Sequence, residues 1–179
     1  MRRTLCLIVA SFALLNAPAA FAALAVGASA PSFTADAAVG GQPFKFNLAE
    51  TLRKGPVVLY FYPKAFTSGC TVEAHNFAEA TDKFKAMGAT VIGISADDIE
   101  TLKKFSVEAC RSKFAVAADA GGKVMKDYDS ALRLLPGAAD RISYLIAPDG
   151  KVAAVFASLN PDGHVDAMLK AVEQLSVKR

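Results

Sequence analysis

Two short runs of apolar, β-prone residues constrain the fold more than any other feature of the sequence. Residues 57–62 (VVLYFY) and 89–95 (ATVIGIS) carry apolar side chains on both sides of the strand alternation. Such a run is typical of a strand buried on both faces, at the centre of a sheet covered by helices. Between them, residues 70–87 show a helical spacing of apolar positions, and Gly88 ends the pattern. Those positions are Val72, Phe77, Phe84 and Met87. This order of elements predicts an α/β fold.

The remaining segments extend this pattern at both ends. Residues 33–46 alternate around a glycine pair, which predicts an N-terminal β-hairpin. Residues 142–158 predict a second hairpin around a P-D-G turn. The other elements expected are helices over 48–54, from 99 towards Cys110, over 124–129 and after 162, and a strand over 115–118. No linker interrupts the series, so we expect one domain: a mixed central sheet flanked by helices, with the first hairpin as an N-terminal extension.

The N-terminus has the pattern of a cleaved signal peptide. Arg2 and Arg3 precede an apolar run over 5–15, and Ala20-Phe21-Ala22 fits a signal-peptidase site. The apolar run is too short for a membrane span, which needs about 20 residues. We therefore expect a signal peptide over 1–22, a mature domain over 23–179, export to a bacterial periplasm, and no stable membrane association after cleavage.

The charge of the chain argues against a nucleic-acid partner. Removing residues 1–22 takes away two arginines and no acid, which lowers the formal net charge from +3 to +1. The basic character of the whole chain is therefore largely a property of the leader, and the remainder has no dense Lys/Arg patch.

Cleavage of the leader would also change the cysteine count. Cys6 would be lost, which leaves Cys70 and Cys110. In an oxidising compartment an even pair suggests a disulfide. The spacing alone leaves open whether that bond is a permanent staple or one that is made and broken during turnover.

Cys70 lies where a loop after the first central strand leads into a helix. Ligand and catalytic sites in open α/β sheets form at the carboxyl ends of strands. The unpaired amides at a helix start favour an anion and lower the pKa of a cysteine there. A thiolate is a nucleophile, so this position suits covalent chemistry at sulfur, with a nearby cation as a further source of stabilisation.

The residues around Cys70 resemble a known family. Pro63 to Cys70 match the P-x-x-x-T-x-x-C motif of peroxiredoxins, and YFYPK…TSGCTVEA, with Glu73, resembles the Q-type subfamily, the bacterioferritin comigratory proteins. Residues 141–156 resemble the second signature of the family, an arginine leading a strand that ends in a P-D-G-K turn. The resemblance implies a thioredoxin-like fold and a thiol peroxidase activity without metal or organic cofactor.

The resemblance also implies roles for four residues. Cys70 would be the peroxidatic cysteine, which attacks hydrogen peroxide or an organic hydroperoxide and becomes a sulfenic acid. Thr67 would donate a hydrogen bond near the thiolate, Arg141 would stabilise the thiolate and the leaving oxygen, and Pro63 would shield the pocket. Without the motif, Thr67 would read as a loop or capping residue and Arg141 as a solvated charge at a strand end.

The second cysteine departs from one version of the family pattern. Many Q-type members carry a resolving cysteine five residues after the first, where this chain has His75. Others place it on the following helix, which is the arrangement that Cys110 fits. We expect an intramolecular Cys70–Cys110 disulfide, reduced by a thioredoxin-like dithiol, in a monomer or weak dimer. The alternatives are a one-cysteine peroxidase resolved by an external thiol and a non-catalytic binding or holdase protein.

Neither histidine is expected to bind a metal. On a helix, Cys70 and His75 would point about 140° apart, and no further cysteine lies between Cys70 and Cys110 to complete a metal site. His164, near the start of the last helix, is expected to be solvated.

Overall fold

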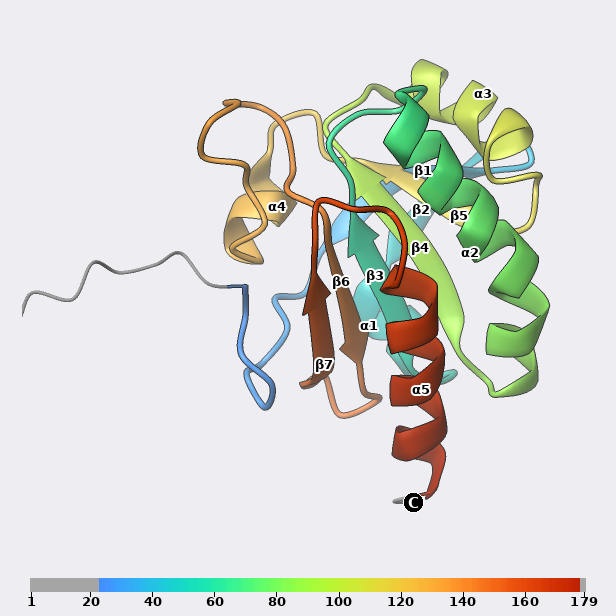
Figure 1. Ribbon diagram of the computed structural model, residues 1–179, viewed down its shortest axis with the longest axis vertical. Helices are drawn as coiled ribbons and strands as arrows, with labels where there is room; N and C mark the ends of the chain where they lie inside the picture. The colour runs from blue at the N-terminus through green and yellow to red at the C-terminus, as the bar shows by residue number, and fades with distance from the viewer. Residues whose placement is uncertain (1–22, 178–179) are drawn as a thin grey trace, which may run out of the picture.

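The computed structural model describes residues 23–177, which form one mixed sheet with helices on both faces (Figure 1). The strands are β1 Thr34–Val39, β2 Gln42–Asn47, β3 Val57–Phe61, β4 Thr90–Ser95, β5 Ala115–Ala118, β6 Ile142–Ile146 and β7 Val152–Ala157. The helices are α1 Leu48–Leu52, α2 Ser68–Ala86, α3 Ile99–Glu108, α4 Lys123–Asp127 and α5 His164–Val177. The predicted signal peptide over 1–22 lies outside the described residues.

The sheet contains seven strands in the order β2-β1-β5-β4-β3-β6-β7. The three central strands β3, β4 and β5 are parallel, and the other pairs are antiparallel. The mixed α/β sheet is therefore confirmed, and the first hairpin extends it at the β5 edge through β1. This topology brings the carboxyl ends of β3 and β4 together, which is where such sheets build sites.

Strand β3 divides the hydrophobic core into two halves. All five of its residues have no exposed surface. Alternate side chains point to opposite faces, so Val58 and Tyr60 pack beneath α2, α3 and α5, while Leu59 and Phe61 pack on the side of α1 and α4. This two-sided burial explains why the strand reads as a continuous apolar run.

Tyr60 fits into the first half of the core because β4 carries a glycine beside it. Its ring stacks on Phe77 of α2 with centroids 4.4 Å apart. A Cβ placed on Gly93 would come within 2.7 Å of the Tyr60 ring, closer than real Cβ atoms approach a neighbour. The glycine at position 93 therefore makes room for the tyrosine.

The structure corrects three expectations at the level of single residues. Val72 is 44% exposed, because α2 packs mainly through small residues and phenylalanines on another face. His164 was expected to be solvated but is fully buried. Helix α3 ends at Glu108, so Cys110 lies in the turn after the helix and not within it.

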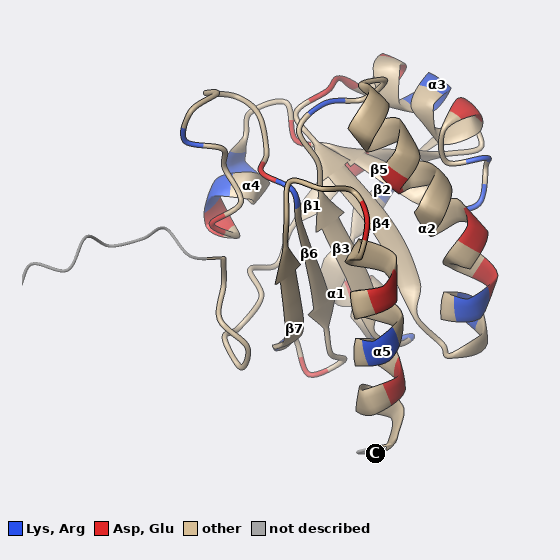
Figure 2. Ribbon diagram, in the orientation of Figure 1, with Lys and Arg blue, Asp and Glu red and all other residues tan. Residues whose placement is uncertain are grey.

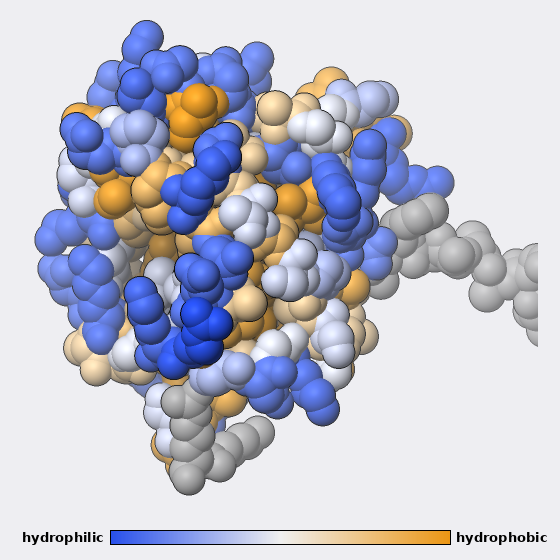
Figure 3. All heavy atoms as spheres, turned by 180° about the vertical axis from the view of Figure 1, so that it is seen from behind, coloured by the Kyte–Doolittle hydropathy of each residue, from blue (hydrophilic) through white to orange (hydrophobic). Residues whose placement is uncertain are grey.

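The surface carries both signs of charge. Along α2 the acidic residues come first and the lysines lie near its end, whereas along α5 a lysine lies between two acidic residues (Figure 2). Seen from behind, the molecule is mainly hydrophilic with scattered apolar areas (Figure 3). Within residues 23–177, the helices are all too short or too polar to cross a bilayer.

Candidate active site

The loop between β3 and α2 is held in place by the end of β4. The Ala65 amide donates a hydrogen bond to Asp97 Oδ2 at 2.7 Å, and the Ser95 hydroxyl donates to the same oxygen at 2.8 Å. Phe66 occupies the left-handed region with φ of 65° and packs edge-on against Phe105 of α3, with centroids 5.2 Å apart. The carboxylate therefore anchors the loop that leads to the helix.

Cys70 lies in the first turn of α2, which begins at Ser68. Its side chain is only 1% exposed. Thr67 precedes the helix in an extended conformation, and its carbonyl accepts the Thr71 amide hydrogen at 2.9 Å. The cysteine therefore lies next to the unpaired amides at the helix start, which favour a thiolate.

Arg141, just before β6, joins Cys70 to Glu73. Its Nη2 lies 3.4 Å from Cys70 Sγ, and its Nη1 pairs with Glu73 Oε2. Its Nε donates to the Leu159 carbonyl at 3.0 Å, which fixes the plane of the guanidinium. A Cβ on Gly69 would come within 3.2 Å of Nη2, so the glycine leaves space for this cation beside the thiol.

Glu73 and Arg141, both buried, shift each other's pKa values. Burial raises the pKa of Glu73 to about 7, against the opposing attraction of Arg141. Burial lowers the pKa of Arg141, but the charges of Glu73 and Cys70 outweigh that effect, and its pKa lies above the usual value. The guanidinium is thus a permanent cation between two groups that can each become an anion.

The two other predicted site residues lie in the loop before Cys70. Pro63 lies two residues after the end of β3 and is half-buried. The Thr67 hydroxyl donates to the Lys64 carbonyl at 3.0 Å, so its proton points back into the loop in this structure and not towards Cys70.

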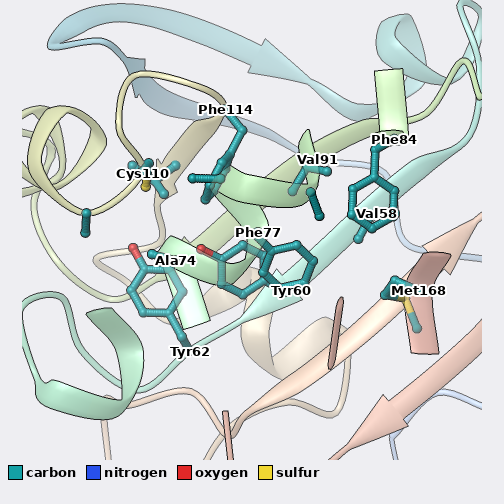
Figure 4. Packing of buried hydrophobic residues seen from close by; sticks show 14 of the residues in the cluster. Val58, Tyr60, Tyr62, Ala74, Phe77, Phe84, Val91, Cys110, Phe114 and Met168 are labelled. Carbon is teal, nitrogen blue, oxygen red and sulfur yellow. The ribbon is translucent and has the colours of Figure 1, made fainter. Parts of the chain in front are cut away.

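Cys110 is a free, fully buried thiol on the same side of the sheet as Cys70. Burial raises its pKa well above the ordinary range for a thiol. The Tyr60 and Tyr62 rings lie beside it, below Phe114 (Figure 4).

Directly after Cys110, Arg111 and Ser112 adopt φ of 50° and 58°, in the left-handed region that favours glycine. Strained backbone therefore follows Cys110.

The histidines differ in their surroundings. His75 is half-buried on α2. No group of three or more His, Cys, Asp and Glu residues that could hold a metal occurs in the part of the chain that is described. His164 lies against the Arg141–Glu73 pair, with Nδ1 3.5 Å from Glu73 Oε1. Nothing in the local sequence around Gly163 pointed to this placement.

Comparisons with known proteins place the chain in a family. The family model described as AhpC/TSA family matches residues 26–155. Peroxiredoxin Q from Populus jackii and from Sedum lineare are each 33% identical over 156 residues, which cover 87% of this chain and 71% and 81% of theirs.

Solved structures agree with these relatives. The crystal structure of peroxidoxin BcpB from Mycobacterium tuberculosis has a TM-score of 0.73 and 32% identity, over 84% of this chain and 97% of its own. The reduced 2-Cys peroxiredoxin of Plasmodium vivax has a TM-score of 0.76 and 27% identity, over 86% and 97%. The fold is therefore the thioredoxin-like fold of peroxiredoxins, as the motif implied. With this agreement of motif, fold and relatives, the chain belongs to the AhpC/TSA family as a Q-type peroxiredoxin, and is thus a thiol-dependent peroxidase.

Proposed function

We propose that the protein reduces hydrogen peroxide or organic hydroperoxides through Cys70, with Cys110 as the resolving thiol. The observation that carries the proposal is the contact of Arg141 Nη2 with Cys70 Sγ at 3.4 Å, at the start of α2. Both the guanidinium and the helix amides stabilise a thiolate at this point. Pro63 shields the sulfur, and Thr67 turns its hydroxyl towards it once a peroxide is bound.

The proposed catalytic cycle has three steps: oxidation of Cys70, resolution by Cys110 and reduction of the disulfide. The Cys70 thiolate attacks one peroxide oxygen and the O–O bond breaks, which gives Cys70 sulfenic acid and an alkoxide or hydroxide. That leaving group takes up the proton that the Cys70 thiol released on ionising, and departs as an alcohol or water. The Cys110 thiolate then attacks that sulfur and forms the disulfide. The hydroxide that is expelled takes up the proton released by the Cys110 thiol and leaves as water. A thioredoxin-like dithiol reduces the disulfide and becomes oxidised itself. For an exported enzyme, which is our proposal for this chain, that dithiol must act outside the cytosol.

Resolution requires Cys110 to leave its pocket. A buried thiol with a raised pKa is a poor nucleophile, since the thiolate is the reactive form. The turn after α3 offers the mobile point, because helix ends open at low cost and Arg111 and Ser112 hold unfavourable backbone conformations there. Opening would release the backbone strain as it exposes the sulfur.

One equivalent of hydrogen peroxide, followed by intact mass and thiol counting on residues 23–179, tests the proposal. We expect loss of both thiols and a decrease of about 2 Da in a monomer. Cys110→Ser should instead gain about 16 Da, and Cys70→Ser should not react rapidly. A gain of about 16 Da in the unaltered chain would assign a one-cysteine mechanism, and no fast reaction would leave a non-catalytic protein.

A further inference from the structure

A second set of buried polar groups lies behind the Arg141–Cys70 contact. It consists of Glu73 on α2, Ser143 on β6 and His164 at the start of α5, and all three are fully buried. The neutral hydroxyl of Ser143 lies 2.8 Å from His164 Nδ1. The peroxidase chemistry described above uses neither Ser143 nor His164.

The hydrogen bonds of His164 fix which of its nitrogens carries a proton. Nε2 lies 3.0 Å from the Ser158 carbonyl oxygen, which can only accept, so Nε2 is the donor. In a neutral ring Nδ1 is then an acceptor, and the Ser143 hydroxyl donates to it. The edge of the ring also contacts Phe156, with centroids 4.8 Å apart, which holds the imidazole in place.

Glu73 Oε1 faces that acceptor. It lies 3.5 Å from Nδ1 and is buried without a hydrogen-bond donor among the described residues. Two acceptors that face each other in a buried site repel, and an unpaired buried carboxylate oxygen is costly. A proton on Oε1 would donate to Nδ1 once the Ser143 hydroxyl turns away from that nitrogen. A proton on Nδ1 would instead be donated to Oε1, with Ser143 Oγ as a second acceptor, so one proton in either place converts the repulsion into a hydrogen bond.

We propose that Glu73 and His164 together hold one buried proton. This proton keeps the pair neutral, so that the positive charge of Arg141 stabilises the Cys70 thiolate and not a Glu73 carboxylate. The inference rests on the proposed role of Cys70. His164 acts through Glu73 and Arg141, and is therefore a positioning residue.

The charge count gives the reason. The titratable groups around Glu73 are Arg141, His164 and the Tyr60 phenol, and Arg141 also contacts Cys70. With the proton present, the Glu73–His164 pair is neutral and the Arg141 cation balances one thiolate. Without the proton, the Glu73–His164 pair carries a negative charge and competes with Cys70 for the Arg141 cation. A thiolate at Cys70 is then disfavoured, because it would be a second anion beside one cation. The raised pKa of Glu73 and the pKa of His164, lowered by burial, agree in placing the proton on the carboxyl side.

Nuclear magnetic resonance of the Glu73 carboxyl carbon in reduced Cys110→Ser protein tests the proton directly. We expect this carbon to titrate near neutral pH. Linked groups shift each other reciprocally, so the further change Cys70→Ser should lower the midpoint. A Glu73 carboxyl that stays ionised down to the ordinary acidic range would overturn the proposal. The measurement needs no turnover, so its outcome is independent of whether the protein reduces peroxides.

His164→Asn tests the link to the thiolate. The asparagine amide would donate to Glu73 Oε1 and stabilise the carboxylate. The rate at which Cys70 reacts with iodoacetamide at neutral pH, measured in the Cys110→Ser background, should then fall by up to about tenfold, because only the thiolate reacts. His75→Asn, at the other histidine of the chain, is the matched control and should leave that rate unchanged. An unchanged alkylation rate in folded His164→Asn would also overturn the proposal. If this variant does not fold, the Glu73 carboxyl titration with His164 intact decides the question.

Discussion

The Arg141 guanidinium contacts Cys70 and Glu73 at the same time: Nη2 lies 3.4 Å from Sγ, while Nη1 pairs with the carboxylate. One cation therefore serves two groups that can ionise, inside a site where neither is more than 1% exposed. How strongly the guanidinium stabilises a thiolate at Cys70 depends on how its positive charge is shared between the sulfur and the carboxylate. The forked shape of the guanidinium makes this sharing possible, because its two outer nitrogens contact both groups at once.

Arg141→Lys should lower the rate of Cys70 oxidation by about a hundredfold or more. Lysine keeps the positive charge, but its single ammonium cannot place one donor on the sulfur and another on Glu73. The rate is measured as single-turnover loss of the Cys70 thiol against peroxide concentration. Arg53→Lys, at the exposed end of α1, is the control and should leave the rate unchanged. Equal rates for Arg141→Lys and the unaltered protein would contradict a role for the guanidinium in the reaction.

Gly69→Ala should slow the same step by about tenfold, although it adds one methyl group. The new Cβ would lie 3.2 Å from Arg141 Nη2, so the guanidinium must shift from its position beside Cys70 by a few tenths of an ångström. Gly121→Ala is the matched control, because a Cβ there meets nothing within 4 Å. If both alanine variants oxidise at the same rate, the position of Arg141 does not limit the reaction.

Two ion pairs hold the turn after Cys110 against α2. Arg111 pairs with Glu79 and Lys113 with Asp82, each at 3.1 Å and each well exposed. Exposed pairs contribute at most about 1 kcal/mol each. In the Glu79→Gln, Asp82→Asn variant, both pairs are lost, so disulfide formation after Cys70 oxidation should accelerate by up to about thirtyfold, while sulfenic acid formation is unchanged.

Stopped-flow tyrosine fluorescence with mass analysis of quenched samples separates these two steps. The control is Asp36→Asn, which breaks the exposed pair with Lys45 on the first hairpin, far from the turn in sequence. Slower disulfide formation in the double variant would show that the ion pairs guide Cys110 towards Cys70 and do not restrain it.

The free energy of unfolding of Glu73→Gln, relative to that of the unaltered protein, should increase as the pH rises. The pKa of Glu73 is raised from 4.5 to about 7 in the folded protein, so the folded state binds more protons than the unfolded state between these values. The unaltered protein therefore loses stability as the pH rises through this window, by about 3 kcal/mol in total. Glutamine does not ionise and avoids that loss.

Urea unfolding of both proteins at about pH 4 and about pH 8 measures the effect. The free energy of unfolding of Glu73→Gln, relative to the unaltered chain, should be larger at the higher pH. A constant difference between the two proteins at both pH values would mean that the carboxyl does not titrate in this window.

Those parts of the fold that depend on local composition could be predicted from the sequence. The run over 57–62 is apolar on both sides because β3 is buried on both faces. This burial can therefore be inferred from the residues of the strand alone. The position of Cys70 at a helix start likewise follows from adjacent residues, an apolar strand, a loop and a helical pattern.

Those features that depend on packing between distant segments could not be predicted. Val72 is apolar but exposed, since α2 approaches the sheet through small residues such as Ala74 and Ala78, which carry little periodic signal. His164 is buried because Ser143, Ser158 and Glu73 surround it, from three other segments of the chain. A single sequence contains no sign that these segments meet.

Tyr60→Phe should stabilise the protein by about 1 kcal/mol, because the hydroxyl is buried without a hydrogen-bond partner among the described residues. The ring would keep its stacking on Phe77 while the uncompensated polar atom is removed. Tyr144→Phe is the matched comparison and should destabilise by about 1–3 kcal/mol. Its hydroxyl donates to the Tyr128 carbonyl at 2.7 Å and also lies 3.2 Å from Ser130 Oγ. Urea unfolding of both variants gives the two signs, and a destabilised Tyr60→Phe would mean that this hydroxyl has a partner in solution.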